Sequence, residues 1–359
     1  MTITYLIGNG FDIGLGLKTG YLDFIGWYLN QPPKARAETW LQKVMAGDIA
    51  QWSDAEKAFG QLCFSQYGEN AIEVYNEGYD AFVAAFHDYL VAENKRFNIP
   101  KSDRRAVAER FVAHAVKLNA AMSQGAAEAY VNQMPKTIDV NFVTFNYTNT
   151  LEQILDFEEG DENEYSVEVV PGVTCRVRLR QICHVHGTLD ADYVFGVDQP
   201  GQIAETTVRQ YCERNGGMLK ARSAEKLRVP NRKWGMSLIS SSDRLVTFGL
   251  SFGESDMSWW LTLEQHVFYN NRSLIVCPFR DELPYGLSLK KRNDIYNEEK
   301  KRVFHVLLQK DAQRIVRLEA VDPPHITVLR PKTIRDAQGI MRKCDYFRLA
   351  DIGWKYVQK

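Results

Sequence analysis

One stretch near the middle of the chain constrains the fold more than any other: residues 138–155, IDVNFVTFNYTNTLEQIL. It opens with an apolar, β-branched run that is typical of a strand buried on both faces. Polar residues then follow from Asn146 to Asn149, and a short amphipathic helix is expected after them. Open α/β sheets bind their ligands where a buried strand ends before a helix. The stretch therefore predicts a ligand site beside Asn146.

The N-terminus carries a second strand-to-helix junction. Residues 3–7, ITYLI, are a strand candidate and lead directly into Gly8, Asn9 and Gly10. Glycines at such a junction let backbone amides approach an anion, but a tight turn with positive φ needs the same residues. The motif alone therefore leaves phosphate binding and a simple turn open. The fingerprint G-x-G-x-x-G is not met, because Ile13 stands at the third glycine, so a hydride-transfer dehydrogenase is not expected.

Residues 21–134 are expected to be almost entirely helical. Within them, residues 72–90 place aromatic and aliphatic side chains on one helix face. A block this long between two sheet strands exceeds an ordinary crossover, so we expect an inserted helical layer that covers one side of the site. Ser53 and Glu56 have the spacing of a capping box, and Glu56 is interpreted as a helix cap.

The second half of the chain predicts a hairpin and further strands. Two alternating segments around Pro171 and Gly172 form the expected hairpin. Residues 198–243 show little periodicity and are expected to be a loop-rich flap over the site. Ser255 or Asp256 is expected to cap the helix after the next strand. The later strand candidates are residues 244–250, 273–277 and 325–329.

Strands that alternate with helices predict an α/β fold with a mostly parallel sheet. We divide the chain into three parts. Residues 1–20 and 135–331 form the α/β core, residues 21–134 form the inserted helical layer, and residues 332–359 form a polar C-terminal tail.

Composition narrows the class of protein. The net charge of −1 over 359 residues gives no indication of nucleic acid or an anionic membrane as partner. The six cysteines include no C-x-x-C pair, which argues against a structural zinc site of the usual spacing. No signal peptide is visible, and no apolar stretch approaches the roughly 20 residues that span a bilayer. We expect a cytoplasmic protein.

Four motifs in order resemble the bacteriophage abortive-infection AbiH family, which in turn resembles the sirtuin-like NAD-binding proteins. The motifs are IGNGFD at 7–12, VTFNYTNTLE at 143–152, HVHG at 184–187 and FGLSFGESD at 248–256. The resemblance spans residues 3 to 277 and includes little of the helical block beyond WSDAEKAFG at 52–60. It implies a Rossmann-like sheet of the sirtuin type.

The resemblance also implies roles for the matching residues. Gly8, Asn9 and Gly10 would line a pyrophosphate. Asn146 would hold the nicotinamide ribose, and His186 would act on ribose hydroxyls or water; these two are the catalytic candidates. The other residues implied in nucleotide binding are Ser251, which would contact the adenosine ribose, with Asp12 and Asp256, and their motif neighbours Phe11, Thr144, Tyr147 and Gly249.

The implied function is antiphage abortive infection through hydrolysis of NAD⁺ to nicotinamide and ADP-ribose. Asp12 replaces the serine of the sirtuin loop, and Thr148 stands where related proteins carry an acid. The sirtuin zinc ribbon is missing, which argues against a protein deacylase. Nicotinamide in NAD⁺ is already a cationic leaving group, so cleavage of its bond to ribose needs no strong acid. A site that holds the ribose, with an amide and an imidazole to orient the attacking water, suffices. No metal is expected.

Other interpretations remain open. His184 and His186 point to one side of a strand and, with Asp190 or Asp192, suggest a metal-dependent hydrolase or nuclease. A non-catalytic sensor that binds a nucleotide or a phage component is the third class. Taken alone, Asn146 is better explained as the cap of the helix at 149–156, and His186 can be a buried histidine bonded to backbone. The sequence does not identify the phage-derived trigger or partner protein, and it leaves a homo-oligomer open.

Overall fold

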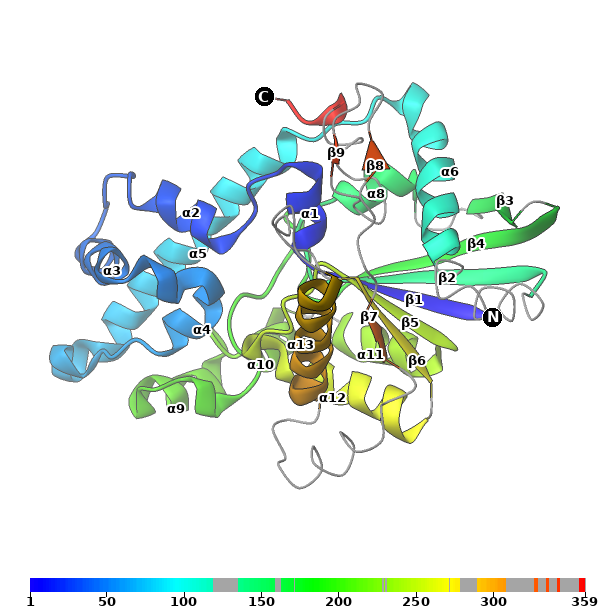
Figure 1. Cartoon of the computed structure of the whole chain (residues 1–359). Coiled ribbons are helices and arrows are strands. Elements are labelled where there is room, and N and C mark those ends of the chain that lie inside the picture. The colour runs from blue at the N-terminus through cyan, green and yellow to red at the C-terminus, as the bar shows by residue number, and fades with distance from the viewer. Residues whose placement is uncertain are drawn as a thin grey trace.

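The computed structural model of the protein describes residues 1–118, 135–158, 163–170, 172–227, 229, 231–270, 272–277, 289–307, 326–328, 334–335, 341–342 and 355–358. These residues form a mixed α/β fold around a seven-stranded sheet (Figure 1). Most of the expected tail at 332–359 lies outside the described residues.

The central sheet has the strand order β3-β4-β2-β1-β5-β6-β7. Neighbouring strands run parallel except at the edge, where β3 pairs antiparallel with β4 as a hairpin. The strands are β1 (Thr2–Ile7), β2 (Thr137–Thr144), β3 (Asn163–Val170), β4 (Val173–His184), β5 (Arg244–Phe248), β6 (Ser273–Cys277) and β7 (Ile326–Val328), and a separate short pair is β8 (Ile334–Arg335) with β9 (Met341–Arg342). The predicted α/β class, mostly parallel sheet and hairpin are confirmed.

The first strand of the chain lies in the middle of this sheet. Leu6 on β1 pairs with Val143 on β2 at one side and with Thr247 on β5 at the other. Side chains on both faces of β1 are buried, which explains its continuous apolar run. Because parallel strands end at the same edge, the segments that follow β1, β2, β4 and β5 leave the sheet side by side.

Helices cover both faces of the sheet. On one face, Phe111 and Leu151 pack with Tyr5 of β1. On the other face, Trp259 and Val303 pack with Leu6. The first face is covered by α1 (Gly10–Leu15), α6 (Lys101–Leu118) and α8 (Thr150–Leu155), and the second by α11 (Asn231–Ser241), α12 (Met257–Glu264) and α13 (Leu289–Leu307). Between β5 and β6, α12 is flanked by η4 (Glu254–Asp256) and η5 (Gln265–Tyr269).

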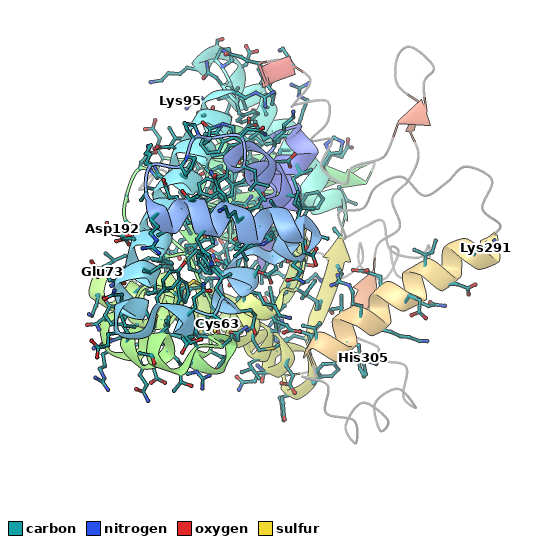
Figure 2. The ribbon with its side chains drawn as sticks, turned by 90° about the vertical axis from the view of Figure 1, so that its left-hand side faces the viewer. Cys63, Glu73, Lys95, Asp192, Lys291 and His305 are labelled. Atoms are coloured by element: carbon teal, nitrogen blue, oxygen red, sulfur yellow. The ribbon has the colours of Figure 1, made fainter. Side chains whose placement is uncertain are left out.

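The remaining helices form a separate layer beyond the carboxyl ends of the strands, which we call the helical layer (Figure 1). It comprises α2 (Tyr21–Tyr28), α3 (Arg36–Gly47), α4 (Ala55–Gly60), α5 (Ala71–Lys95), α9 (Thr206–Asn215) and α10 (Lys220–Leu227), with the short turns η1 (Ile49–Asp54), η2 (Ser65–Asn70) and η3 (Pro200–Gln202). Its own core is aromatic, with Phe82 packed against Phe24 and Phe59. In Figure 2, Glu73 and Lys95 mark the two ends of α5, and α13, which carries His305, lies apart from this layer.

One expectation about the chain between the hairpin and β5 is wrong. Residues 198–243 are not loop-rich but contain α9, α10 and α11. Each of these short helices buries only a narrow stripe, such as Val208 and Cys212 on α9, so the sequence shows little periodicity. In the described part of the chain, no helix combines the length and the apolarity needed to cross a membrane.

Candidate active site

The loops after β1 and β5 meet through their backbones. Gly8 N donates to Phe248 O at 2.9 Å, and Gly10 N donates to Gly249 O at 3.0 Å. A Cβ on Gly8 would lie 2.6 Å from Gly249 O, and one on Gly249, whose φ is +65°, would lie 2.6 Å from Gly10 Cα. This approach is therefore open only to glycine at both positions.

A cavity of about 670 Å³ lies at this junction, between the sheet edge and the helical layer. From β1 the chain continues to β2 on one side, and from β5 it continues to β6 on the other, so the cavity lies where the winding of the sheet reverses. Of the residues predicted for the site, those that line the cavity are Gly8, Asn9, Gly10, Asp12, Asn146, Tyr147, His186, Gly249, Ser251 and Asp256. The structure thus brings together segments from four separate motifs.

Two predicted residues have other roles. Phe11 packs into the core against Phe111 and Phe248, with ring centroids 6.0 and 6.1 Å away. Thr144 does not line the cavity, but its Oγ1 accepts a 3.1 Å hydrogen bond from the backbone N–H of Asn146. Both residues support the site without facing it.

Asp12 joins the first loop to the loop after β2. Its two carboxylate oxygens accept 2.6 Å hydrogen bonds from Thr148 Oγ1 and Thr150 Oγ1. Burial raises the pKa of Asp12 to about 6, although hydrogen bonds from Thr148, Thr150 and the Asn146 side chain oppose the rise. The carboxyl group therefore titrates near neutral pH.

Asn146 presents an unpaired acceptor at the cavity. The residue is 7% exposed and lines the cavity, and its side-chain Oδ1 is buried with no hydrogen-bond partner in the described structure. The N-cap of α8 is Asn149, so Asn146 is not the helix cap. Buried polar atoms are normally paired, so an unpaired one in a cavity indicates a position for a ligand hydroxyl or a water molecule.

His184 is held by the protein on both ring nitrogens. Nδ1 lies 2.9 Å from Asn146 O, and Nε2 lies 2.5 Å from Glu152 Oε1. Burial works to lower the pKa of His184, but Glu152 outweighs it and the pKa is raised. Both ring nitrogens of His184 are thus engaged by the protein.

The metal-site interpretation also lacks its acids. Asp190 and Asp192 are both exposed and do not line the cavity. Among the residues that the structure describes, no group of three or more His, Cys, Asp or Glu side chains is arranged to hold a metal ion. The His184 and His186 pair therefore does not form the predicted alternative centre.

His186, just beyond the end of β4, faces the cavity instead. Its Nε2 lies 3.0 Å from Asp256 Oδ1, within ion-pair distance but without the alignment of a hydrogen bond. Burial and the charge of Lys220 lower the pKa of His186, against the opposing effect of Asp256. The imidazole is therefore neutral at neutral pH. The Asp256 carboxylate favours a proton on Nε2, which leaves Nδ1 as the basic nitrogen.

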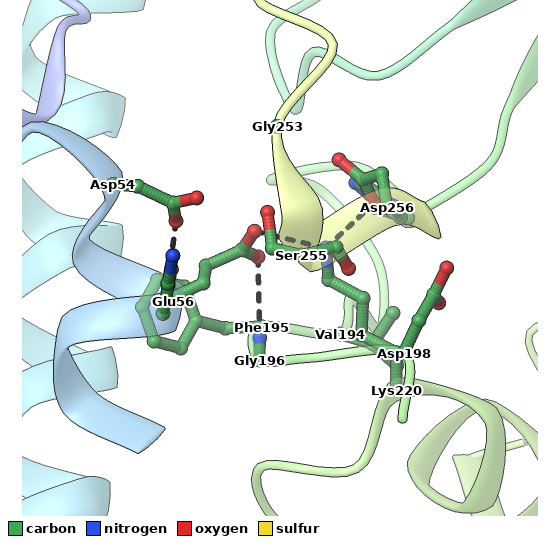
Figure 3. Close-up of polar contacts among 12 residues, drawn as sticks. Asp54, Glu56, Val194, Phe195, Gly196, Asp198, Lys220, Gly253, Ser255 and Asp256 are labelled. Carbon is green, nitrogen blue, oxygen red and sulfur yellow. Dashed lines mark hydrogen bonds and ion pairs between the residues drawn. The ribbon is translucent and has the colours of Figure 1, made fainter. Parts of the chain in front are cut away.

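A buried charge cluster that the sequence did not indicate adjoins His186 through Asp256, and Figure 3 shows its members Glu56, Lys220 and Asp256. Lys220 Nζ lies 2.9 Å from Glu56 Oε2 and 2.8 Å from Asp256 Oδ1. Lys220 is 2% exposed and Glu56 is 3% exposed, and Glu56 Oε1 also accepts from Gly196 N at 3.2 Å. Three parts of the chain, α4, α10 and the segment after β5, are joined at this one ammonium group.

The charges in this cluster stabilise one another. Burial would raise the pKa of Asp256, but Lys220 and His186 outweigh it and hold the pKa well below its usual range. Burial would lower the pKa of Lys220, but Asp256 and Glu56 hold it above its usual range. Burial raises the pKa of Glu56 to about 8, although Lys220 opposes the rise. Asp256 and Lys220 are therefore an ion pair at neutral pH.

This arrangement corrects one helix-cap expectation and qualifies a second. The N-cap of α4 is Asp54, whose carboxylate accepts from Lys57 N at 3.1 Å, so Glu56 is not the cap. Asp256 stands at the N-cap position of α12, as expected, but its carboxylate makes no cap hydrogen bond, because it is directed to Lys220 and His186. Sequence spacing alone could have found Glu56 only through its place in WSDAEKAFG, and it gives no indication of Lys220.

Comparison with known proteins identifies a family. The family described as bacteriophage abortive infection AbiH matches residues 4–277, which include most of β1, all of β2 to β6 and all the motifs around the cavity. No curated protein matches the chain. With about three quarters of its length matched, the chain belongs to the AbiH family of bacteriophage abortive-infection proteins.

Proposed function

We propose that this protein serves antiphage abortive infection by hydrolysing NAD⁺ to nicotinamide and ADP-ribose. Membership in the AbiH family supports the defence role. The observation that carries the proposed chemistry is the pairing of Asn146 and His186 at one cavity, the first with a free amide oxygen and the second with a neutral imidazole.

The size and place of the cavity support a nucleotide as ligand. Its volume of about 670 Å³ lies within the range of roughly 300–1,000 Å³ of small-molecule sites. We further propose that the sheet is a Rossmann-like one of the sirtuin type, in which α1 to α6 interrupt the path from β1 to β2. The reversal of winding between β1 and β5 supports this, because nucleotides bind at such points.

The residues divide the work of the reaction as follows. Asn146 Oδ1 accepts a hydrogen bond from a ribose hydroxyl or from the attacking water and so orients it. Water adds to C1′ of the ribose as the bond to the nicotinamide nitrogen breaks, and that electron pair leaves with nicotinamide. Nδ1 of the neutral His186 accepts the proton of the water, and Asp256 stabilises the imidazolium that forms.

Incubation of the purified protein with NAD⁺, followed by mass spectrometry, tests the proposal. Nicotinamide and ADP-ribose should appear together, and neither should appear with His186→Ala. Since a defence enzyme can require a trigger, the assay is repeated with lysate from phage-infected cells. If NAD⁺ binds but no products form in either assay, the protein is a nucleotide sensor and not an NAD⁺ hydrolase.

A further inference from the structure

The cavity has an unusual charge for a site proposed to take a nucleotide. Five carboxylates line it, those of Asp12, Asp23, Asp54, Glu56 and Asp256. Among the described residues that line it there is no lysine or arginine. Lys220 contacts Glu56 and Asp256 and offsets one charge only. The lining therefore holds several acidic groups and, among the described residues, no cationic side chain of its own.

Three of these acids, Asp54, Glu56 and Asp256, lie where α4 meets the segment after β5 (Figure 3). A Cβ on Gly253 would lie 3.3 Å from Asp54 Oδ2, which shows how closely these two segments approach. Burial raises the pKa of Asp54, and the neighbouring Asp256 adds to the rise. A carboxyl group in this state gains from a nearby cation, because the cation stabilises its charged form.

Aromatic rings line the cavity beside these acids. Phe86 lies 5.6 Å from Tyr21 and 5.9 Å from Tyr147, measured between ring centroids. All three rings line the cavity. Aromatic faces attract organic cations, and carboxylates nearby strengthen the attraction. An anionic phosphate at the same place would meet like charges.

An independent feature indicates that a ligand reaches this region. Asn146 Oδ1 is buried and unpaired at the cavity, and the ring of its neighbour Tyr147 is part of the aromatic lining. The amide oxygen can accept a hydrogen bond from a hydroxyl group of a ribose whose C1′ carries a charged ring. The acidic, aromatic and amide groups that line the cavity are together suited to bind a cationic N-glycoside.

We infer that α2 and α4 of the helical layer form a cation-selective subsite, which takes the positively charged pyridinium ring of an oxidised nicotinamide nucleotide and discriminates against the neutral dihydropyridine ring. The identity of the ring rests on the proposed function. Asp54 is the specificity-determining residue, through its charge. The phosphates of the ligand lie away from this end of the cavity.

Calorimetric binding of carba-NAD⁺ and of its reduced form tests the inference, because the carbocyclic analogue cannot be hydrolysed and the two probes differ by one charge. The wild type should bind the oxidised form at least tenfold more tightly. Asp54→Asn keeps a residue that caps α4 well but removes the charge. It should weaken the oxidised form about three- to tenfold and leave the reduced form unchanged. Asp48→Asn, an exposed acid outside the cavity, is the matched control and should change neither.

The outcomes separate this inference from the proposed reaction. Equal affinity for the two probes, or equal losses for both in Asp54→Asn, overturns the subsite even where NAD⁺ is hydrolysed. Selective binding of the oxidised form without hydrolysis of NAD⁺ supports the subsite and contradicts the proposed reaction. If neither probe binds, both the subsite and the proposed reaction are contradicted.

Discussion

Nδ1 of His184 donates a 2.9 Å hydrogen bond to the backbone carbonyl of Asn146. The histidine that does not face the cavity therefore holds the residue that does. Because Glu152 on α8 accepts from the other ring nitrogen, β4, the loop after β2 and α8 are fixed to one another through one side chain. The two histidines of the HVHG motif have different tasks.

Replacing His184 with glutamine should lower the stability of the protein by about 1–3 kcal/mol, because charged hydrogen bonds are lost from a buried position. The pKa of His184 is raised in the folded state above its ordinary 6.5. Its contribution is thus fully present below the unfolded pKa and is lost as the pH rises through the folded pKa. The difference in Tm between the two proteins should be largest below pH 6.5 and shrink above it. His114→Gln, at a half-buried histidine on α6, serves as control and should show no such trend.

Asn146→Ala and His186→Ala should each remove NAD⁺ hydrolysis by about 10²–10⁴-fold, the usual loss for a positioned acid–base group or polar anchor. Growth arrest on overproduction in bacteria should disappear with the activity. Val143→Ala, in the core beneath the site, should instead lower Tm and leave the rate per folded molecule unchanged. Folded Asn146 and His186 variants that turn over NAD⁺ at the wild-type rate would contradict the assignment.

Lys220→Met should be strongly destabilising, by about 3–5 kcal/mol, because it leaves Glu56 and Asp256 buried without their shared cation. Adding Glu56→Gln should recover part of the loss, as denaturant unfolding can measure. Lys220 also lowers the pKa of His186, so its removal should raise that pKa. The acidic limb of the pH–rate profile should therefore move to higher pH in Lys220→Met, a shift that a purely structural role would not produce.

Gly249→Ala should damage both stability and nucleotide binding, since its φ is +65° and an added Cβ meets Gly10 at 2.6 Å. The expected cost is about 1–3 kcal/mol. Gly26→Ala, on α2, has nothing within 4 Å of the added Cβ and should be neutral or stabilising by up to about 1 kcal/mol. Thermal unfolding of the Gly249→Ala and Gly26→Ala variants, with and without NAD⁺, distinguishes the loss of the close contact with Gly10 from a general effect of replacing glycine.

Much of the fold and the place of the cavity could be predicted from the buried parallel strands. The runs at 138–145 and 244–250 are mostly apolar because both faces of their strands are largely buried, and parallel strands deliver the residues after them to one edge. Asn146 and Asp256 could thus be placed together before any coordinates. The hairpin followed from alternation around Gly172.

The charge cluster could not be predicted in this way. Ser53 and Glu56 match a capping box, and nothing local shows that Asp54 caps α4 while Glu56 turns inward. Lys220 begins a short helix, and its partners are distant in sequence and follow no periodic pattern. The same lack of periodicity hid the helices in 198–243. Side-chain pairs that form only in the folded chain leave no trace in local spacing.

The central position of β1 has a consequence for how the protein is made. β1 is synthesised first but pairs with strands that begin at Thr137 and Arg244. At roughly 5–20 residues per second, the ribosome needs roughly 10–50 s to supply the second partner. Until then the nascent chain has neither the finished sheet edge nor the loop that carries Asp256. A truncated product that ends before β5 therefore lacks the complete cavity, whatever chemistry that cavity performs.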